Sequence, residues 1–261
     1  MSNVLLTEQA DGVRVLTLNR PGSRNALSGD LISALYAALV ELDTDDTVRA
    51  AVLTGADPAF CAGVDLKEAA RDGAKYFGRF RTEDCIGQAA LARKPLIGAV
   101  NGATFTGGLE LALGCDFLIA SERAVFADTH ARVGVLPGGG LTARLPPLVG
   151  PAWARRMSMT GEVVDATLAE RIGLVTEVVP HERLRARALE LAAAAAEVPP
   201  RDMLGLKEIY TGGTEAVFGP ALAVEHRVSR AHRTDFDELD GRRSAVMARN
   251  REQLDGERHD G

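Results

Sequence analysis

Short apolar runs alternate with helical segments through most of the chain, and this alternation constrains the fold more than any other feature. The runs are rich in aliphatic and β-branched residues and are bounded by Gly, Pro or polar residues, as strands are. The expected strands cover residues 13–18, 50–54, 95–100, 116–120, 124–127 and 175–179. Strand–helix alternation with short connections predicts an α/β core.

Apolar residues at helical spacing mark the segments between these strands. Ser28 suits an N-cap, and Leu31, Leu35 and Leu39 follow it on one helix face. The other expected helices cover residues 76–92, 107–113, 141–148, 151–159, 165–170 and 184–198. Beyond the paired prolines at 199–200 the sequence is mainly helical and rich in charge. We therefore expect a core over residues 1–200 and a helical C-terminal region over residues 201–261.

Composition narrows the function classes. The chain has 261 residues, 46% of them hydrophobic, which is enough for one large buried core. Its net charge of −6 argues against a general nucleic-acid binder. Three cysteines without CxxC spacing argue against a disulfide framework and a zinc site, so no metal is expected. No signal peptide or long apolar span is recognisable, and a cytoplasmic protein with no membrane partner is expected.

Two glycine-containing segments carry candidate chemistry. In the first, residues 59–67, Gly63 precedes a helix expected to begin near Asp65. A glycine there turns the chain so that the following N–H groups point outward and can bind an anion or an oxyanion. Taken alone, the same residues fit an ordinary glycine turn better, because such turns are common.

The second segment, residues 101–110, leads from a strand through a glycine-rich turn to a helix beginning at Gly107. The first N–H groups of a helix are free and partially positive. Glu110 lies one helical turn after Gly107 on the same face, so its carboxylate would stand beside whatever the Gly107 N–H binds. Alternatively, Glu110 is an exposed charge that favours the helix N-terminus.

Together, in this order, the two segments resemble the enoyl-CoA hydratase/isomerase family, the crotonase superfamily. The matching motifs include NRP at 19–21, NAL at 25–27, AFCAGVDL at 59–66, AVNG at 99–102 and GGLELA at 107–112. The similarity extends over about residues 4–200. The resemblance implies a crotonase-type α/β spiral of repeated ββα units with a helical C-terminal region. It also implies a homotrimer or a homohexamer (a dimer of trimers).

The resemblance further implies roles for single residues. The oxyanion-hole N–H groups correspond to Val64 and Gly107, and the acid/base to Glu110. The coenzyme A surface corresponds to Arg24, Ala26, Ala62, Gly63, Asp65, Leu66, Lys67 and Gly108. Arg24 and Lys67 would neutralise CoA phosphates or be plain surface charges. No separate cofactor is implied, because coenzyme A arrives as part of the substrate.

One position departs from the family pattern. Hydratases of the family use two glutamates, and the second position is His130 here. Histidine donates or accepts a proton near neutral pH. If this segment is extended, Asp128 lies on the same face and orients the imidazole or raises its pKa. His130 either replaces the second glutamate or only fills space or contacts substrate.

The implied reaction is addition of water to a trans-2-enoyl-CoA, giving a 3-hydroxyacyl-CoA. The alternatives are double-bond isomerisation or thioester hydrolysis through the same enolate, and acyl-CoA binding without catalysis. Acyl specificity is expected to depend on residues 69–85 and on the C-terminal helices. The remaining histidines, His181, His226, His232 and His259, are expected to be structural or exposed.

Overall fold

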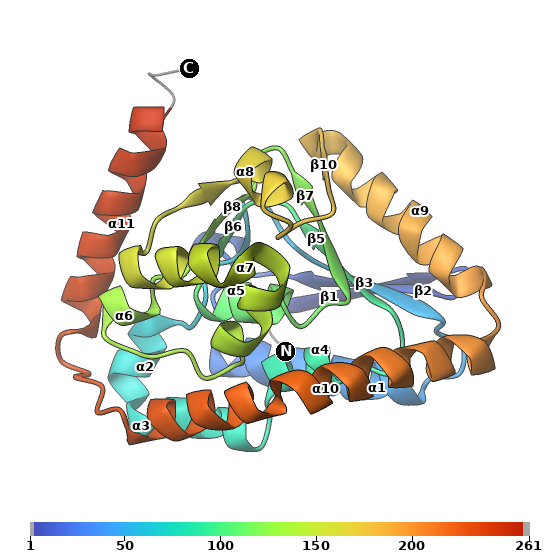
Figure 1. Cartoon of the computed structure of the whole chain (residues 1–261), viewed down its shortest axis with the longest axis horizontal. Coiled ribbons are helices and arrows are strands. Elements are labelled where there is room, and N and C mark those ends of the chain that lie inside the picture. The colour runs from blue at the N-terminus through green and yellow to red at the C-terminus, as the bar shows by residue number, and fades with distance from the viewer. Residues whose placement is uncertain (1–2, 258–261) are drawn as a thin grey trace.

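Six strands form the larger sheet in the computed structural model of the protein, which describes residues 3–257 (Figure 1). Their order is β1 (Leu5–Ala10), β2 (Val13–Leu18), β3 (Ala50–Gly55), β5 (Leu96–Val100), β7 (Phe117–Ser121) and β10 (Glu177–Val179). β1 pairs antiparallel with β2, and every other neighbouring pair in this sheet is parallel. The expected strands are present, and β1 is an addition that the sequence did not predict.

A smaller sheet accompanies it within the described residues. Its strands are β4 (Ala59–Cys61), β6 (Ala103–Phe105), β8 (Val125–Ala127) and β9 (Val164–Asp165). β4, β6 and β8 each follow a strand of the larger sheet, and each is followed by a helix: α2 (Leu66–Asp72), α5 (Gly107–Ala112) or α6 (His130–Val133). The strand–strand–helix order therefore repeats along the chain, which is the ββα spiral that the sequence led us to expect.

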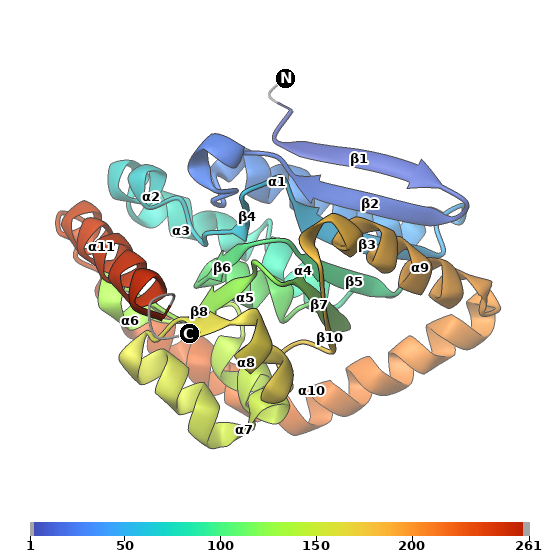
Figure 2. The same ribbon diagram turned by 90° about the horizontal axis from the view of Figure 1, so that it is seen from above.

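Apart from the edge strand β1, which is largely exposed, the larger sheet has helices on both faces, which explains why its inner strands are mostly apolar. On one side, Leu16 and Leu18 of β2 pack in the same core as Leu35 of α1 (Gly29–Thr44). On the other side, Val13 and Val15 pack with α9 (Leu184–Glu197), which lies across the sheet (Figure 2).

The helices follow the expected pattern with one correction. Ser28 caps α1 by accepting a hydrogen bond from the Leu31 N–H. The helix predicted at 76–92 is instead α3 (Ala74–Gly78), a 3₁₀ turn η2 (Arg79–Arg81) and α4 (Cys85–Ala90). The break occurs because Asp84 caps a new helix, accepting from the Gly87 N–H at 2.8 Å. The remaining elements of this part are α7 (Leu141–Thr160, kinked at Gly150), α8 (Ala166–Arg171), η1 (Pro21–Ser23) and η3 (His181–Arg183).

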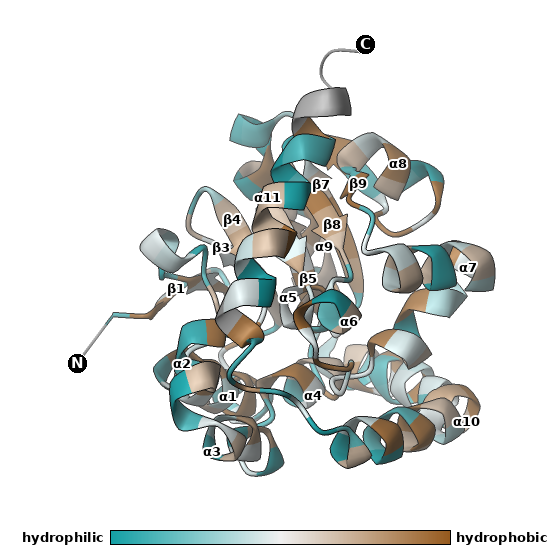
Figure 3. Ribbon diagram, turned by 90° about the vertical axis from the view of Figure 1, so that its left-hand side faces the viewer, coloured by the Kyte–Doolittle hydropathy of each residue, from teal (hydrophilic) through white to brown (hydrophobic). Residues whose placement is uncertain are grey.

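Two long helices end the described chain, α10 (Pro200–Ala231) and α11 (Leu239–Glu257). α10 packs along α7, and α11 packs on α2 and α6 (Figure 1). Leu239 and Val246 of α11 join the same hydrophobic core as the sheet, so the division at residue 200 stays a prediction. Strands such as β7 and β8 are apolar whereas α11 is largely polar (Figure 3). Over residues 3–257, no helix combines the length and apolar character needed to cross a membrane.

Candidate active site

The two predicted oxyanion donors lie side by side at one end of α5. Leu27 holds the first segment: its N–H donates to the Gly63 carbonyl at 2.8 Å, and its carbonyl accepts from the Asp65 N–H at 3.2 Å. Gly107 begins α5, so its N–H has no acceptor within the helix. A Cβ placed on Gly107 would lie 3.6 Å from the Val64 nitrogen. Among residues 3–257, neither the Val64 nor the Gly107 N–H donates to the protein.

At Gly63 and Gly108 the surrounding protein leaves no room for a side chain. Gly63 has a φ of +92°, and a Cβ there would lie 1.8 Å from the Thr106 Oγ1. A Cβ on Gly108 would lie 2.1 Å from the Cys61 carbonyl oxygen, so close packing of β4 on α5 explains that glycine. The nearest protein atoms to a Cβ on Gly107 are at ordinary contact distance. The protein itself therefore imposes no steric requirement for glycine at residue 107.

Thr106 is a site residue that sequence reasoning missed. It has a φ of +50°, which is strained for a β-branched residue. Its N–H donates to the Ala127 carbonyl at 3.1 Å, and its carbonyl accepts from the Glu110 N–H at 3.0 Å. These contacts fix the turn that directs the Gly107 N–H. No sequence signal marks this residue, because threonine is not a typical residue for a left-handed turn.

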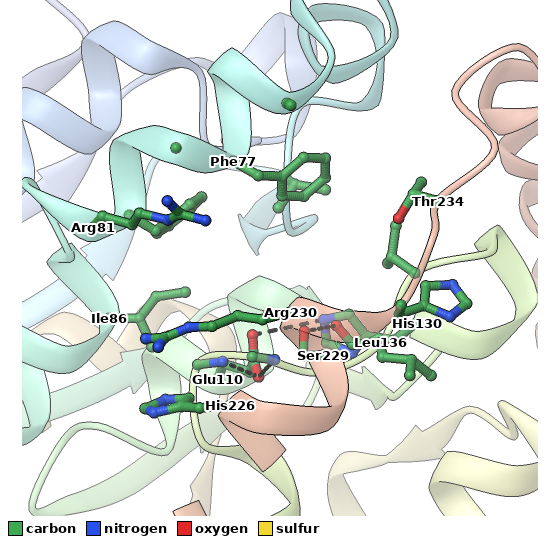
Figure 4. A pocket seen from close by; sticks show the side chains of 18 of the residues that line it. Phe77, Arg81, Ile86, Glu110, His130, Leu136, His226, Ser229, Arg230 and Thr234 are labelled. Carbon is green, nitrogen blue, oxygen red and sulfur yellow. Dashed lines mark hydrogen bonds and ion pairs between the residues drawn. The ribbon is translucent and has the colours of Figure 1, made fainter. Parts of the chain in front are cut away.

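The Glu110 carboxylate is buried, with 4% of the residue exposed, and its two oxygens have different surroundings. Oε1 accepts from the N–H groups of Gly138 at 3.2 Å, Gly139 at 2.8 Å and Leu141 at 3.4 Å. Leu141 is the first residue of α7, and Gly138 and Gly139 lie in the loop that leads into it, so the carboxylate lies at a helix N-terminus, which stabilises negative charge. Oε2 is left facing the imidazole of His130 (Figure 4).

His130 lies between two carboxylates. Its Nδ1 is 2.7 Å from the Asp128 Oδ1, and its Nε2 is 3.6 Å from the Glu110 Oε2. Burial acts to lower the pKa of His130, but the charge of Glu110 and the hydrogen bond to Asp128 outweigh it and raise the pKa to about 10. Burial acts to raise the pKa of Asp128, but the hydrogen bond and charge of His130 leave it lowered. His130 is therefore an imidazolium at neutral pH.

The expected Asp128–His130 contact exists, but its predicted geometry is wrong. The segment is not extended, because β8 ends at Ala127 and His130 begins α6. A turn at Thr129 (φ −108°, ψ 14°) brings the two side chains together, and the His130 N–H also donates to the Asp128 Oδ1 at 3.2 Å.

Val64, Glu110 and His130 line a cavity of about 500 Å³. Its inner wall contains Val64, Glu110, His130 and the Gly138–Gly139 loop. Most of the outer wall comes from the two segments expected to determine acyl specificity, and Ile86 lies just beyond the first of them. The residues are Ala74, Phe77, Gly78, Phe80, Arg81, Asp84 and Ile86 on one side, and His226, Ser229, Arg230, His232, Arg233, Thr234 and Phe236 on the other (Figure 4).

Of the other described histidines, two line the cavity and one does not. His226 and His232, for which the sequence indicated no site, line this cavity. His181 instead lies within hydrogen-bond distance of Ser121, at 2.9 Å, and Asp57, at 3.1 Å, outside the cavity. His259 lies outside the described residues.

The residues predicted to bind coenzyme A flank Val64. The Ala62 N–H donates to the Arg24 carbonyl at 3.0 Å, and this hydrogen bond joins the predicted coenzyme A residues at 24–26 to those at 62–67. Arg24 and Lys67 are exposed, while Ala26 is buried. Asp65 caps α2, which begins at Leu66, and pairs with Arg20 at 3.0 Å, so its carboxylate already has a structural role. Contact of these residues with coenzyme A stays a prediction.

The paired N–H groups at the start of α5, set in a spiral of ββα units, define a protein of the crotonase type. A family model described as enoyl-CoA hydratase/isomerase matches residues 8–246. A probable enoyl-CoA hydratase from Rhizobium meliloti is 38% identical over 250 residues, which cover 95% of this chain and 96% of that protein. The chain belongs to the enoyl-CoA hydratase/isomerase family.

Solved structures agree with this assignment. An enoyl-CoA hydratase from Mycobacterium smegmatis aligns with a TM-score of 0.78 and 47% identity, covering 88% of this chain and 98% of the other. An enoyl-CoA hydratase/isomerase from Pseudoalteromonas atlantica aligns with a TM-score of 0.83 and 29% identity, covering 94% and 97%. The predicted fold class is confirmed by these neighbours.

Proposed function

We propose that this protein adds water to the double bond of a trans-2-enoyl-CoA, giving a 3-hydroxyacyl-CoA. The observation that carries the proposal is the placement of two free N–H groups, Val64 and Gly107, beside each other and in one site with Glu110 and His130. The N–H pair suits an oxygen that gains negative charge, and the two side chains suit the transfer of protons beside it.

In this proposal the Val64 and Gly107 N–H groups bind the thioester carbonyl oxygen. Attack of water at Cβ moves electrons through the double bond onto that oxygen, forming an enolate. Donors fixed by the backbone need no reorganisation as this charge develops, and loss of one such donor typically slows a reaction by roughly 100- to 1000-fold.

Glu110 and His130 divide the two proton transfers. Glu110 accepts a proton from the attacking water through Oε2, because Oε1 already accepts from backbone N–H groups. His130 donates its Nε2 proton to Cα as the enolate collapses, which replaces the role of the second glutamate. Asp128 is a positioning residue that holds the imidazole through Nδ1.

The starting state is restored by a short proton transfer. After turnover Glu110 is protonated and His130 is neutral, and the proton returns from Oε2 to Nε2, atoms that are 3.6 Å apart before reaction. The product has gained one hydroxyl at Cβ and one hydrogen at Cα, so the elements of water balance. The scheme needs no metal or redox cofactor, because it moves only protons and an electron pair.

The test is a mass-spectrometric assay of a trans-2-enoyl-CoA panel with wild type, Glu110→Gln and His130→Gln. A product heavier by one water supports hydration, an isomer of unchanged mass supports isomerisation, and free CoA thiol supports hydrolysis. We expect hydration, lost by more than 100-fold in Glu110→Gln, since a general base typically contributes about 10²–10⁴ in rate. Binding of enoyl-CoA without any product would support a non-catalytic acyl-CoA binder.

We also propose that the protein assembles as a trimer or a dimer of trimers. The outer side of α10 exposes large apolar residues, including Ile209 at 72%, Tyr210 at 68% and Val217 at 68%, and a second copy of the chain would cover them. Light scattering after gel filtration tests this, and a monomer at micromolar concentration would refute it. A cytoplasmic location stays a prediction that subcellular fractionation tests.

A further inference from the structure

Three arginines in the wall of the active-site cavity lack an acidic partner. They are Arg81 of η2, Arg230 near the end of α10, and Arg233 in the loop that follows. Within residues 3–257, the side chain of none of the three forms an ion pair or a hydrogen bond. A guanidinium is charged at any physiological pH, and its planar fork matches a carboxylate or a phosphate.

The acidic residues of the same wall are already engaged. Glu110 accepts from the start of α7 through Oε1 and faces His130 through Oε2. Asp84 accepts from the Gly87 N–H at 2.8 Å as the N-cap of α4. No other acidic side chain lines the cavity in the described structure, and the wall therefore has an excess of positive charge.

The basic face of α10 is held over the cavity by a buried carboxylate. Glu225, which is 6% exposed, accepts from the Gly140 N–H at 2.6 Å and from the Thr142 N–H at 2.7 Å. This contact fixes α10 on the N-terminus of α7. His226 and Arg230 follow on the same side of α10 and line the cavity as a result.

The cationic groups face each other across apolar side chains. Arg81 and Arg230 project into the cavity from opposite sides, with Phe77 and Ile86 beside them (Figure 4). An apolar wall with fixed charges matches a carbon chain that ends in an anion. The same wall contains Val64 and Glu110, so these arginines belong to the compartment of the reacting carbons.

We infer that the preferred substrate is an enoyl-CoA whose acyl chain ends in a carboxylate, bound by Arg230 together with Arg81. This inference rests on the proposed hydratase function and names its substrate class. The rival ligand for these arginines is a phosphate of coenzyme A. The pantetheine arm separates those phosphates from the thioester, whereas Arg230 lines the same cavity as Glu110.

The experiment compares matched pairs of trans-2-enoyl-CoA substrates of increasing chain length. One member of each pair ends in a carboxylate and the other in its methyl ester. At the best length we expect wild type to favour the carboxylate in kcat/KM by on the order of tenfold to a hundredfold, as a charge-assisted hydrogen-bonded pair does. Arg230→Gln and Arg81→Gln are expected to remove this preference while leaving kcat/KM for the ester nearly unchanged.

Arg227→Gln is the matched control. Arg227 lies on α10 within one turn of Arg230 and is exposed as Arg230 is, but it does not line the cavity, so the preference should persist in this variant. An equal loss for both members of a pair in Arg230→Gln would assign the arginine to a CoA phosphate and overturn the inference. A wild-type preference for the ester would also overturn it.

A second readout separates this inference from the proposed function. Saturated acyl-CoA pairs, which cannot be hydrated, are titrated by calorimetry with wild type and Arg230→Gln. Tighter binding of the carboxylate by wild type, lost in the variant, supports the inference even if no enoyl-CoA is hydrated. Equal binding of both members by wild type refutes it, whatever the hydration assay shows.

Discussion

Asp128→Asn offers the sharpest test of the proton-donor role of His130. The asparagine keeps an oxygen that accepts from Nδ1 but removes the negative charge 2.7 Å from the imidazole. Burial opposes protonation of His130, and the charge of Glu110 and the bond to Asp128 raise its pKa to about 10. Loss of a neighbouring opposite charge typically changes a pKa by about 1–3, so we expect the pKa of His130 to fall to roughly 7–9.

The direction of the effect on rate follows from which form is active. The acid form of His130 donates the proton, so activity is present below the pKa and is lost as pH rises through it. With a pKa of about 8 in the variant, the protonated fraction at pH 9 is about tenfold below that of wild type, whereas at pH 7 the two are nearly equal. The ratio of wild-type to variant kcat/KM should therefore increase about tenfold between pH 7 and pH 9.

The assay is hydration of an enoyl-CoA, followed by loss of the ultraviolet absorbance of the conjugated thioester across this pH range. Asp57→Asn is the control, because Asp57 also lies beside a histidine, with its Oδ2 3.1 Å from the His181 Nε2, but outside the cavity. That variant should keep the wild-type profile. If the alkaline limb is the same in wild type and Asp128→Asn, His130 is not the proton donor that the reasoning requires.

Three further predictions follow from the same contacts. Gly63→Ala should lower the free energy of unfolding by at least about 1–3 kcal/mol in denaturant titrations, because the new Cβ would meet the Thr106 Oγ1 and Gly63 has a positive φ. Gly107→Ala should leave the free energy of unfolding unchanged and lower kcat/KM. Glu225→Ala should cost about 1–3 kcal/mol by leaving buried N–H groups at the start of α7 without an acceptor, while Glu208→Ala, exposed on the same helix, should not. The raised pKa of His130 should add stability that is fully present below pH 6.5 and is lost as pH rises to about 10, so the stability difference between wild type and His130→Gln should shrink over that range.

The larger sheet could be predicted because burial on both faces leaves a signal in the sequence itself. Val13, Val15 and Val52 pack on α9 while Leu16 and Leu53 pack on the opposite side, so apolar residues occupy most positions of β2 and β3. The strands β4 and β6 span three residues each and lie beside Gly63 and Gly102, so the sequence indicated a loop and a turn there. The break before α4 was missed because the apolar pattern of residues 76–92 continues across the cap at Asp84.

The site was predictable where its residues are near in sequence and not where they are brought together by tertiary structure. Gly107 and Glu110 share one helix turn, so their common orientation follows from helical geometry. The raised pKa of His130 depends on Glu110, whose Oε2 lies 3.6 Å from the His130 Nε2 only in the folded chain. His226 and Arg230 are far from Glu110 and His130 along the chain. A charged face on a C-terminal helix is usually solvated, so the sequence did not indicate a place for them in the site. Their place in the cavity follows only from the docking of α10 on α7.

The N-terminus of α7 links the proposed chemistry to the proposed substrate selection. Its free N–H groups bind two buried carboxylates: Glu110 through Gly139, and Glu225 through Gly140 and Thr142. The first of these is the proposed base, and the second holds the helix that carries Arg230 over the cavity. A shift of this loop would displace the base and the acyl-binding wall together, because both depend on consecutive N–H groups of one helix end. Variation within α10 that keeps Glu225 can therefore alter the acyl group that is accepted without moving Glu110.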